Sequence, residues 1–554
     1  MKEIDPTRPV HWERGNEIAD VDSRMYPTVE WLYNKGKEPK AFFMCEYAHA
    51  MGNAVGNLQE YWDAFYSSDV LSGGCIWDWV DQALVKKTGR YDKDGNPETI
   101  LAYGGDFDEK PNDGPFCCNG LIRPDRKVTA KLIEVAHVYR QIAVSSEDAA
   151  SGKAVVWNRF SFTDTKAFDA CWALVEDGKV IETGVWNLPS VAPLQKVEVA
   201  LPRPSSEIKA GREYFMNVYF KLRQDELWAG KGHVIAADQM EWKNVAETKP
   251  VSTASVKPSV KCDEKTLTVT SGGNVAVFCL KTGALVSLSM NGCNILDPKY
   301  GTEAGPRLSC MRALGDNDNW VRDIYDYGLT QLRYHSSPVT YSSKSDGSVE
   351  VTAFTDVTGS KSAGFEHTQK WVFGTDGSIV LHNNVKPYGH MPEALPRLGL
   401  SLVLDKAFEN IEWYGRGPWE NYVDRKTGSF VGDYVSTVSE QYEEYVRPQF
   451  NGYKSDVRWV ALYDGSGKGV RFSSDNPLYV QALHYDWEDL EFARHRNGQE
   501  RINAMKEPRE EVCLNLDLRQ LGIGGRSCGP RPLDEYIFPV REEDWTLVIE
   551  PFSK

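Results

Sequence analysis

The hydrophobic pattern of the first 140 residues alternates between short apolar runs and helix-like stripes. "AFFMCE" (41–46) and "GGCIWDW" (73–79) are continuous apolar runs of the kind that buried parallel strands show, and "LAYGGDF" (101–107) is expected to be a third strand. A helix with Asn53 as its cap is expected between the first two runs. Its apolar face consists of Val55, Leu58, Tyr61, Trp62 and Phe65. A further helix over 128–142 completes an alternation of strands and helices, which is typical of a parallel sheet or (β/α) barrel.

From about residue 143 the pattern changes to that of β-hairpins. The stretches 168–186 and 371–385 each predict two strands around a central Asp-Gly turn, and 266–292 predicts three short strands joined by glycine turns. A polar stretch, 242–258, separates the two β-rich regions and is typical of a linker. The predicted fold class is therefore multidomain, with an α/β part followed by all-β parts.

These patterns divide the 554 residues into three domains, because a chain of this length is too long for one core. Residues 1–142 are expected to form the α/β domain, and residues 143–250 are expected to form one β-sandwich. Residues 259–554 exceed an ordinary sandwich and predict one large, long-stranded β domain.

Composition and charge narrow the classes of function. The net charge of -16 argues against a nucleic-acid partner, which needs clustered Lys and Arg. No stretch approaches the roughly 18 consecutive apolar residues of a membrane span. The 11 cysteines include no CxxC pair, which argues against a zinc clamp. The 17 tryptophans and 26 tyrosines suit protein cores and sugar-binding platforms alike.

The first candidate for chemistry is Glu46, at the carboxyl end of the first apolar run. A (β/α) barrel places its catalytic groups at that edge, so Glu46 could act as a nucleophile, a general base or a metal ligand. The alternative is a salt-bridged glutamate at a strand end. His49 could bind a substrate hydroxyl or be a satisfied structural histidine. The residues alone leave these alternatives open.

Four longer blocks stand out by their order and spacing. They are "CEYAHAMGN" (45–53), "GGCIWDWVDQ" (73–82), "AYGGDFDEKPNDGPFCCNGL" (102–121) and "GPWENYVDR" (417–425). Together with "LGIGG" (521–525), they closely resemble the bacterial β-galactosidases of glycoside hydrolase family 2. The resemblance covers essentially the whole chain, aligned to the family's second half. It implies the second half of a (β/α)8 TIM barrel, an immunoglobulin-like β-sandwich and the large β-sandwich of the β-galactosidase small-chain type.

The resemblance implies a retaining hydrolase that releases terminal non-reducing β-D-galactose from β-galactosides. Glu46 matches the nucleophile that forms the galactosyl-enzyme. His49 matches a residue that contacts the galactose hydroxyls, Trp77 matches the platform at the floor of the galactose site, and Tyr26 matches a tyrosine beside the nucleophile. The block 417–425 is expected to shape the C-terminal β domain and to carry no chemistry.

By the same resemblance, Na⁺ and Mg²⁺ are implied as cofactors. Phe116, through its backbone carbonyl, and Asn119 match sodium ligands that help to hold the sugar, so Asn119 also belongs to the substrate site. Asn112 falls in a loop linked to a second metal, while the principal Mg²⁺ ligands are expected upstream of this chain. Cys513 stands where the family usually presents a tryptophan to the aglycone, which leaves a preference for lactose open.

A retaining glycosidase needs two carboxyl groups, about 5–5.5 Å apart. In the family, the second one lies shortly upstream of a segment like "DPTRPV" (5–10), so we expect this chain to lack the acid/base glutamate and the N-terminal domains. The expected partners are a β-galactoside and either further copies in a homo-oligomer or a complementing N-terminal segment. The compartment, cytoplasm or periplasm, stays open. The alternatives are a non-catalytic carbohydrate-binding or complementing fragment, and a related family 2 β-glycosidase.

Overall fold

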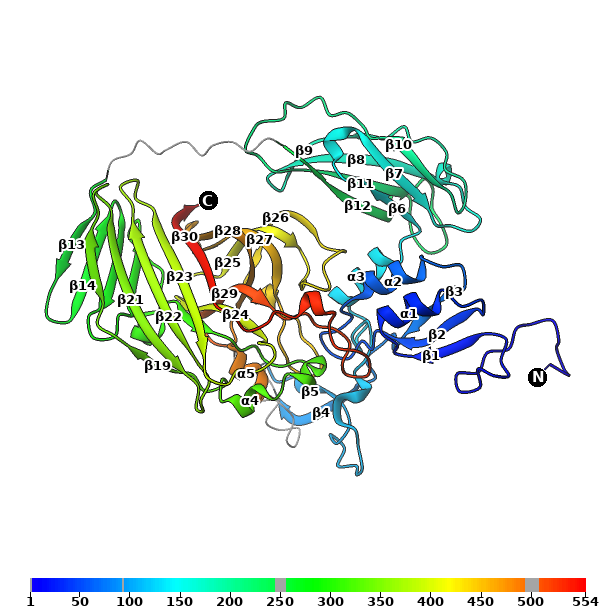
Figure 1. Cartoon of the computed structure of the whole chain (residues 1–554), viewed down its shortest axis with the longest axis horizontal. Helices are drawn as coiled ribbons and strands as arrows, with labels where there is room; N and C mark the ends of the chain where they lie inside the picture. The colour runs from blue at the N-terminus through cyan, green and yellow to red at the C-terminus, as the bar shows by residue number, and fades with distance from the viewer. Residues whose placement is uncertain (1, 92–93, 245–255, 494–507) are drawn as a thin grey trace.

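The chain folds into an α/β part followed by two β-rich parts, which Figure 1 shows in blue, in cyan to green, and in green to red. The computed structural model describes residues 2–91, 94–244, 256–493 and 508–554. Most of the predicted linker, 242–258, lies outside these ranges.

The α/β part is built on a three-stranded parallel sheet in the order β1-β2-β3. Its elements are β1 (Asp22–Met25), α1 (Val29–Lys35), β2 (Phe42–Tyr47), α2 (Leu58–Phe65), β3 (Leu71–Ile76) and α3 (Ala130–Val138). The first two apolar runs are thus confirmed as parallel strands. Leu58, Tyr61 and Phe65 of α2 pack in one core with Phe42 and Met44 of β2. The second predicted helix is confirmed as α3, although it is shorter than expected.

The predicted cap of the first helix is wrong. Asn57, in a left-handed conformation, directly precedes α2, and Val55 lies before the helix begins. The Asn53 side chain instead donates hydrogen bonds to the Tyr422 hydroxyl at 2.8 Å and the Phe450 carbonyl at 3.0 Å. Local periodicity could not reveal these partners, because they lie almost 400 residues away along the chain.

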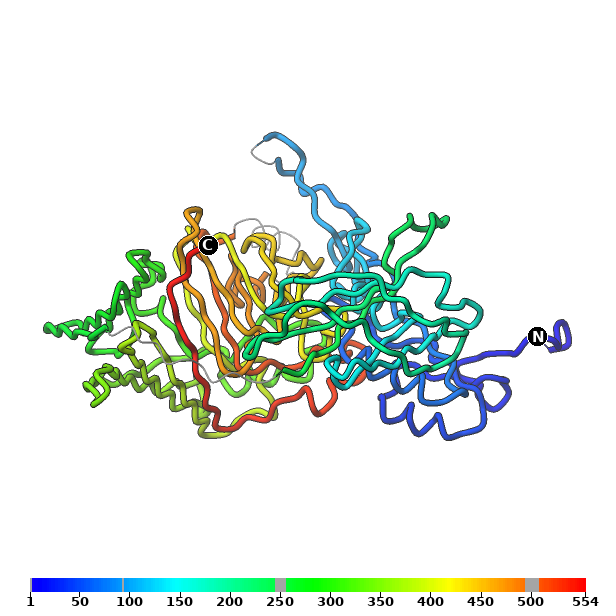
Figure 2. Tube along the Cα trace, turned by 90° about the horizontal axis from the view of Figure 1, so that it is seen from above, coloured from blue at the N-terminus to red at the C-terminus, as the bar shows by residue number. Residues whose placement is uncertain are grey.

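The predicted third parallel strand is also wrong. The strand β5 (Pro97–Ala102) pairs antiparallel with β4 (Leu84–Tyr91), and this hairpin projects from the body of the molecule (Figure 2). Lys86, Lys87 and Arg90 lie along β4, so the hairpin has no apolar face to bury in a parallel sheet.

The middle part consists of two antiparallel sheets, in the orders β10-β7-β6 and β12-β11-β8-β9. Their strands are β6 (Ile142–Ser145), β7 (Lys153–Asn158), β8 (Phe168–Glu176), β9 (Lys179–Val185), β10 (Lys196–Ala200), β11 (Tyr214–Leu222) and β12 (Val234–Trp242). Val156 from one sheet and Val218 from the other belong to the same core. The hairpin predicted over 168–186 is confirmed, and the positive φ angles of Asp177 and Gly178 fit its two-residue turn.

The C-terminal part contains a five-stranded and a 13-stranded antiparallel sheet. The smaller sheet comprises β13 (Ser259–Cys262), β14 (Thr266–Ser271), β15 (Asn274–Cys279), β16 (Leu285–Met290) and β17 (Cys293–Asn294). The larger comprises β18 (Arg307–Ser309), β19 (Arg333–Ser336), β20 (Thr340–Ser343), β21 (Val349–Thr358), β22 (Gly364–Phe373), β23 (Ile379–Tyr388), β24 (Arg397–Leu404), β25 (Asn410–Gly417), β26 (Phe430–Thr437), β27 (Lys454–Tyr463), β28 (Lys468–Leu483), β29 (Val512–Gln520) and β30 (Glu543–Ser553). Two short helices, α4 (Ile324–Tyr327) and α5 (Trp487–Phe492), lie between strands.

The two sheets of the C-terminal part share one core. The rings of Phe278 on β15 and Trp371 on β22 meet edge to face with centroids 5.6 Å apart. The strands predicted over 266–292 and the hairpin predicted over 371–385 are all present. These confirmations follow from alternating apolar residues and glycine turns, both of which are local signals.

The block 417–425 joins the C-terminal part to the α/β part. Arg425 donates a hydrogen bond to the Ala54 carbonyl at 2.7 Å and pairs with Glu420 at 2.9 Å, and the two side chains are only 1% and 3% exposed. The carbonyl of Asp424 accepts from the Asn57 backbone N–H at 2.9 Å. The block therefore holds the segment that follows β2, as well as shaping its own domain.

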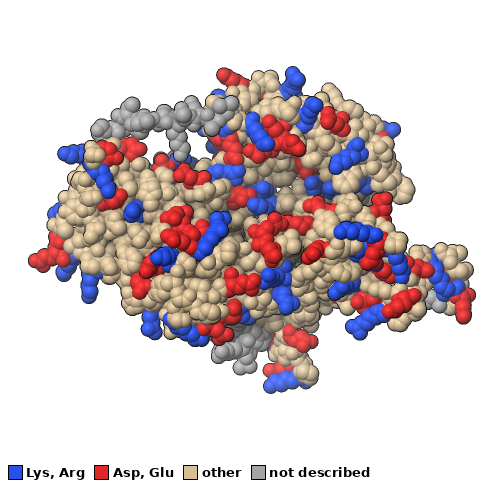
Figure 3. Space-filling view, in the orientation of Figure 1, with Lys and Arg blue, Asp and Glu red and all other residues tan. Residues whose placement is uncertain are grey.

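Charged side chains of both signs are interspersed on the face drawn in Figure 3, where they form no continuous band of one sign. Among the described helices, none combines the length and the apolar character that crossing a membrane requires.

We predict that Arg425→Met lowers the free energy of unfolding of the α/β part by about 3–5 kcal/mol, because Glu420 is left buried without its counter-charge. Urea denaturation, with hydrogen exchange over residues 48–57, measures the loss. The control is Lys406→Met in the exposed pair with Glu510, which should cost no more than about 1 kcal/mol. If both variants lost the same amount of stability, Arg425 would not support the 48–57 segment in the way proposed.

Candidate active site

The candidate site lies at the carboxyl ends of the three parallel strands. Glu46 on β2 is in register with Met25 of β1, and Tyr26 follows directly. Trp77 follows β3, and its backbone N–H donates to the Tyr47 carbonyl at 3.1 Å. Because neighbouring parallel strands end at the same edge of a sheet, Glu46, Tyr26 and Trp77 are brought together there.

The Tyr26 phenol lies against the Glu46 carboxylate. Burial raises the pKa of Tyr26 well above its usual range, and the negative charge of Glu46 and a hydrogen bond to it raise it further. The phenol therefore stays protonated and can donate to the half-buried carboxylate. The Tyr26 backbone has a φ of 49°, in the left-handed region that an aromatic residue rarely adopts. Its neighbours fix this conformation, in part through the Tyr26 N–H, which donates to the Glu46 carbonyl at 2.9 Å.

His49 is 1% exposed and uses one ring nitrogen within the protein. Its Nδ1 forms a hydrogen bond of 2.8 Å with the Ser527 hydroxyl, while its Nε2 has no partner among the described residues. Burial lowers the pKa of His49 to about 4; the nearby Asp316 carboxylate opposes this shift and Lys131 reinforces it. At neutral pH the imidazole is uncharged, and its second nitrogen is available to a substrate hydroxyl.

The indole of Trp77, which directly follows β3, is 40% exposed. Its backbone carbonyl accepts from the Ala50 N–H at 2.7 Å, so the backbones of the His49 and Trp77 segments are tied together. An exposed indole held in this way offers a flat apolar surface to a sugar ring.

Phe116 and Asn119 form a compact pair of oxygen-bearing groups. The Asn119 side chain is almost fully buried, its amide nitrogen donates to the Phe116 carbonyl at 3.1 Å, and its Oδ1 has no partner among the described residues. Rotation of this amide would bring two oxygens together, which is the type of donor that a hard cation such as Na⁺ prefers. The Phe116 ring also lies beside His49, with centroids 5.1 Å apart. The pair therefore fits a cation next to the His49 imidazole.

The structure does not bring Asn112 to a metal site. Its amide donates to the Glu109 carbonyl at 3.0 Å and accepts from the Gly114 N–H at 3.1 Å, so both ends serve its own exposed loop. Within the described ranges, no group of three or more His, Cys, Asp or Glu side chains could hold a metal ion. These contacts place Asn112 in its own loop, and its link to a metal stays a prediction.

A loop of the C-terminal part, 522–530, closes one side of the site. Ser527 reaches His49, and a side chain built at Gly529 would lie 3.5 Å from the Tyr26 ring. The Cys528 thiol lies near Glu46, since burial and then the charge of Glu46 raise its pKa. Sequence reasoning did not identify this loop as part of the site. Its signal was the "LGIGG" block (521–525), with which the loop begins.

Cys513 is packed inside the large sheet of the C-terminal part. It is buried in β29, in register with Val403 of β24 and Leu483 of β28. The side chain therefore fills a sheet interior, and Ser527 and Cys528 are the side chains that the C-terminal part directs toward His49 and Glu46.

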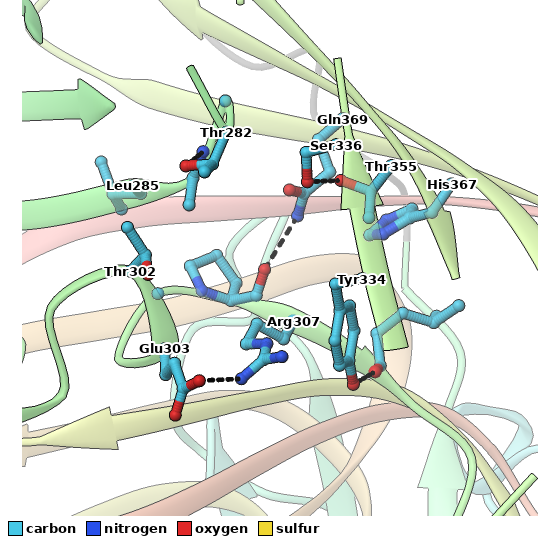
Figure 4. Close-up of a pocket in the computed structure, with 15 residues that line it drawn as sticks. Thr282, Leu285, Thr302, Glu303, Arg307, Tyr334, Ser336, Thr355, His367 and Gln369 are labelled. Carbon is cyan, nitrogen blue, oxygen red and sulfur yellow. Dashed lines mark hydrogen bonds and ion pairs between the residues drawn. The ribbon is translucent and has the colours of Figure 1, made fainter. Parts of the chain in front are cut away.

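The cavity drawn in Figure 4 lies elsewhere, within the C-terminal part, and contains none of the candidate residues. It measures about 180 Å³. Its polar groups bind one another, through Ser336 with Thr355 at 2.9 Å, Gln369 with the Pro306 carbonyl at 3.3 Å, Tyr334 with the Leu308 carbonyl at 2.7 Å, and Arg307 with Glu303 at 3.9 Å. Because these groups already have partners, we assign no ligand to this cavity.

Comparisons with known proteins match three successive stretches of the chain. The family model described as "Glycosyl hydrolases family 2, TIM barrel domain" matches residues 1–144, that of "Beta-galactosidase, domain 4" matches residues 154–243, and that of "Beta galactosidase small chain" matches residues 270–549.

Curated relatives also match almost the whole of this chain. A β-galactosidase of Priestia megaterium is 33% identical over 540 residues, which cover 95% of this chain and 49% of that protein. A β-galactosidase of Halalkalibacterium halodurans is 29% identical over 557 residues, which cover 98% of this chain and 52% of that protein. The chain thus spans about half the length of these curated relatives.

We predict that His49 weakens the fold in acid. Its folded-state pKa of about 4 lies below the unfolded value of 6.5, so the unfolded state binds more protons between these pH values. Its contribution to stability is fully present above pH 6.5 and falls by on the order of 3 kcal/mol as the pH drops to 4.

The pH dependence of the free energy of unfolding of the wild type and of His49→Gln tests this prediction. The glutamine variant should gain stability relative to the wild type as the pH falls through this window. A difference between the two proteins that does not change with pH would contradict the burial of a neutral imidazole.

Proposed function

The chain belongs to the β-galactosidases of glycoside hydrolase family 2, and we propose that it carries the nucleophile of a retaining β-galactosidase. The main support is Glu46 at the carboxyl end of β2, with the protonated Tyr26 phenol against its carboxylate. The proposed substrate is a β-galactoside with a terminal non-reducing β-D-galactose. In the same proposal, residues 1–142 are the second half of a (β/α)8 barrel, residues 143–250 an immunoglobulin-like β-sandwich and residues 259–554 the large β-sandwich.

In the proposed mechanism, Glu46 attacks the anomeric carbon and forms a galactosyl ester. The Tyr26 hydroxyl donates to the carboxylate and orients it for the attack. A second carboxyl group protonates the leaving oxygen and later activates water. We assign this acid/base role to no residue of this chain.

Sugar binding is proposed for His49 and Trp77. The Nε2 of the neutral imidazole meets a sugar hydroxyl, and the exposed indole face of Trp77 stacks on the apolar side of the ring. Both groups are fixed through the backbone contacts of the 48–57 segment, so binding needs no reordering of their backbones.

We propose that the Phe116 carbonyl and the Asn119 amide oxygen hold Na⁺. The buried and unpaired Oδ1 of Asn119 supports this assignment. A bound Na⁺ would supply a fixed positive charge to which a sugar hydroxyl can coordinate. The chain's own contribution is to keep both oxygens within reach of the His49 ring, which packs on Phe116.

A dinitrophenyl 2-deoxy-2-fluoro-galactoside tests the role of Glu46, because its leaving group departs without protonation and the fluorine slows hydrolysis of the ester. We expect mass spectrometry of the chain, alone or mixed with a complementing N-terminal segment, to find one adduct, on the peptide that contains Glu46. Glu46→Gln should abolish the adduct.

The matched control is Glu30→Gln on the exposed side of α1, which should label like the wild type. An adduct on another carboxylate would refute the assignment of Glu46. Binding of galactose without any adduct would favour a non-catalytic carbohydrate-binding protein.

The sodium proposal predicts tighter galactose binding in NaCl than in choline chloride of equal ionic strength. Calorimetric titration should show a difference of about three- to tenfold in Kd, comparable to one good polar contact. Asn119→Ala should remove the difference, whereas Asn112→Ala should preserve it, because Asn112 serves its own loop. A sodium effect that persists in Asn119→Ala would disprove the assigned ligand.

A further inference from the structure

The 522–530 loop has no regular secondary structure, but hydrogen bonds hold its backbone in place. The buried Asp424 carboxylate accepts from the backbone N–H groups of Ile523 at 2.8 Å and Gly524 at 2.7 Å. The carbonyl of Gly524 accepts from the Gly56 N–H at 3.2 Å. A Cβ atom at Gly524, where φ is +60°, would come within 2.5 Å of the Pro532 backbone, so this turn requires glycine. The start of the loop is thereby fixed to both parts of the molecule.

The tip of the loop is fixed by two asparagines of the 315–320 segment. The Ser527 N–H donates to the Asn317 side-chain oxygen at 2.8 Å, and the Asn319 amide donates to the Arg526 carbonyl at 2.9 Å. The Gly529 N–H donates back to the Gly525 carbonyl at 2.6 Å. These contacts set the position of the Ser527 backbone, and therefore the direction of its hydroxyl.

The Ser527 hydroxyl meets the Nδ1 of His49 at 2.8 Å, across a separation of 478 residues in the sequence. A neutral imidazole has one nitrogen that donates and one that accepts, and a serine hydroxyl can form a hydrogen bond with Nδ1 in either tautomer. The contact therefore fixes the orientation of the ring, and with it the direction in which Nε2, the buried and unpaired nitrogen, points.

We propose that Ser527 is a positioning residue for sugar binding: its hydroxyl fixes the ring orientation of His49, so that Nε2 is directed toward a hydroxyl of the galactose ring. This inference rests on the proposed function of His49. It makes the C-terminal part a contributor to the sugar site through a side chain that does not itself touch the sugar.

The test is a double-mutant cycle on the rate of covalent labelling of Glu46 by the dinitrophenyl 2-deoxy-2-fluoro-galactoside. Ser527→Ala should raise the half-saturating concentration about three- to tenfold, the amount that one polar contact contributes. In a His49→Gln background the same substitution should have no further effect, because Ser527 acts through His49. Ser527→Thr, which keeps the hydroxyl, should restore labelling. Arg526→Gln, an exposed neighbour in the same loop, is the matched control.

A second measurement does not depend on labelling. In protein with ¹⁵N-labelled histidine, the His49 ring signals, assigned by their loss in His49→Gln, should report a hydrogen-bonded Nδ1 in the wild type and in Ser527→Thr. The Nδ1 signal should shift in Ser527→Ala, because that hydrogen bond is lost.

The outcomes separate the two proposals. Equal effects of Ser527→Ala in both backgrounds, or an unchanged Nδ1 signal in Ser527→Ala, would overturn the positioning role. Absence of labelling in the wild type would count against the proposed function of Glu46, while the ring signals would still decide whether Ser527 binds the His49 ring.

Discussion

The contact on which the candidate site most depends is the buried pair of Arg425 and Glu420, with its hydrogen bond to the Ala54 carbonyl. The segment after β2 is not regular: Ala48, Val55 and Asn57 all have positive φ angles. Such conformations cost on the order of 1–3 kcal/mol each and persist only where the surroundings enforce them. The block 417–425 provides that enforcement, so the conformation around His49 is set by a domain almost 400 residues away.

This dependence explains why the sheet carrying Glu46 need not be stable by itself. Three parallel strands with two open edges are a small sheet, and much of its support comes from polar contacts to the C-terminal part. Besides Arg425, these include Asn53 with Tyr422 and Glu134 with the Thr427 hydroxyl at 2.7 Å. The site is therefore formed at a domain boundary. Groups from both sides, His49 on one and Ser527 on the other, meet only when the parts are docked.

The sequence predicted those features that depend on local patterns. The apolar run before Glu46 predicted β2, and Asp-Gly pairs predicted the hairpins, because strand burial and turn geometry act over a few residues. The predicted cap at Asn53 failed, since its partners come from distant segments. Glu46 and His49 were candidates because of their position at the end of an apolar run, and the family resemblance added Trp77 and a role for each residue. Ser527 was missed because a single serine has no periodicity, and only the fold shows which ring it faces.

Lys131 links the architecture of the site to its electrostatics. This side chain is 1% exposed and donates to the Ala50 carbonyl at 2.9 Å and the Gly120 carbonyl at 2.6 Å, so it bridges the His49 segment and the loop that carries Asn119. Its positive charge also helps to lower the pKa of His49. The cation that holds the two loops together therefore also helps to keep the imidazole neutral. A neutral group avoids the desolvation cost that a charged imidazole would carry in this buried position, and it can still form a hydrogen bond to an uncharged sugar.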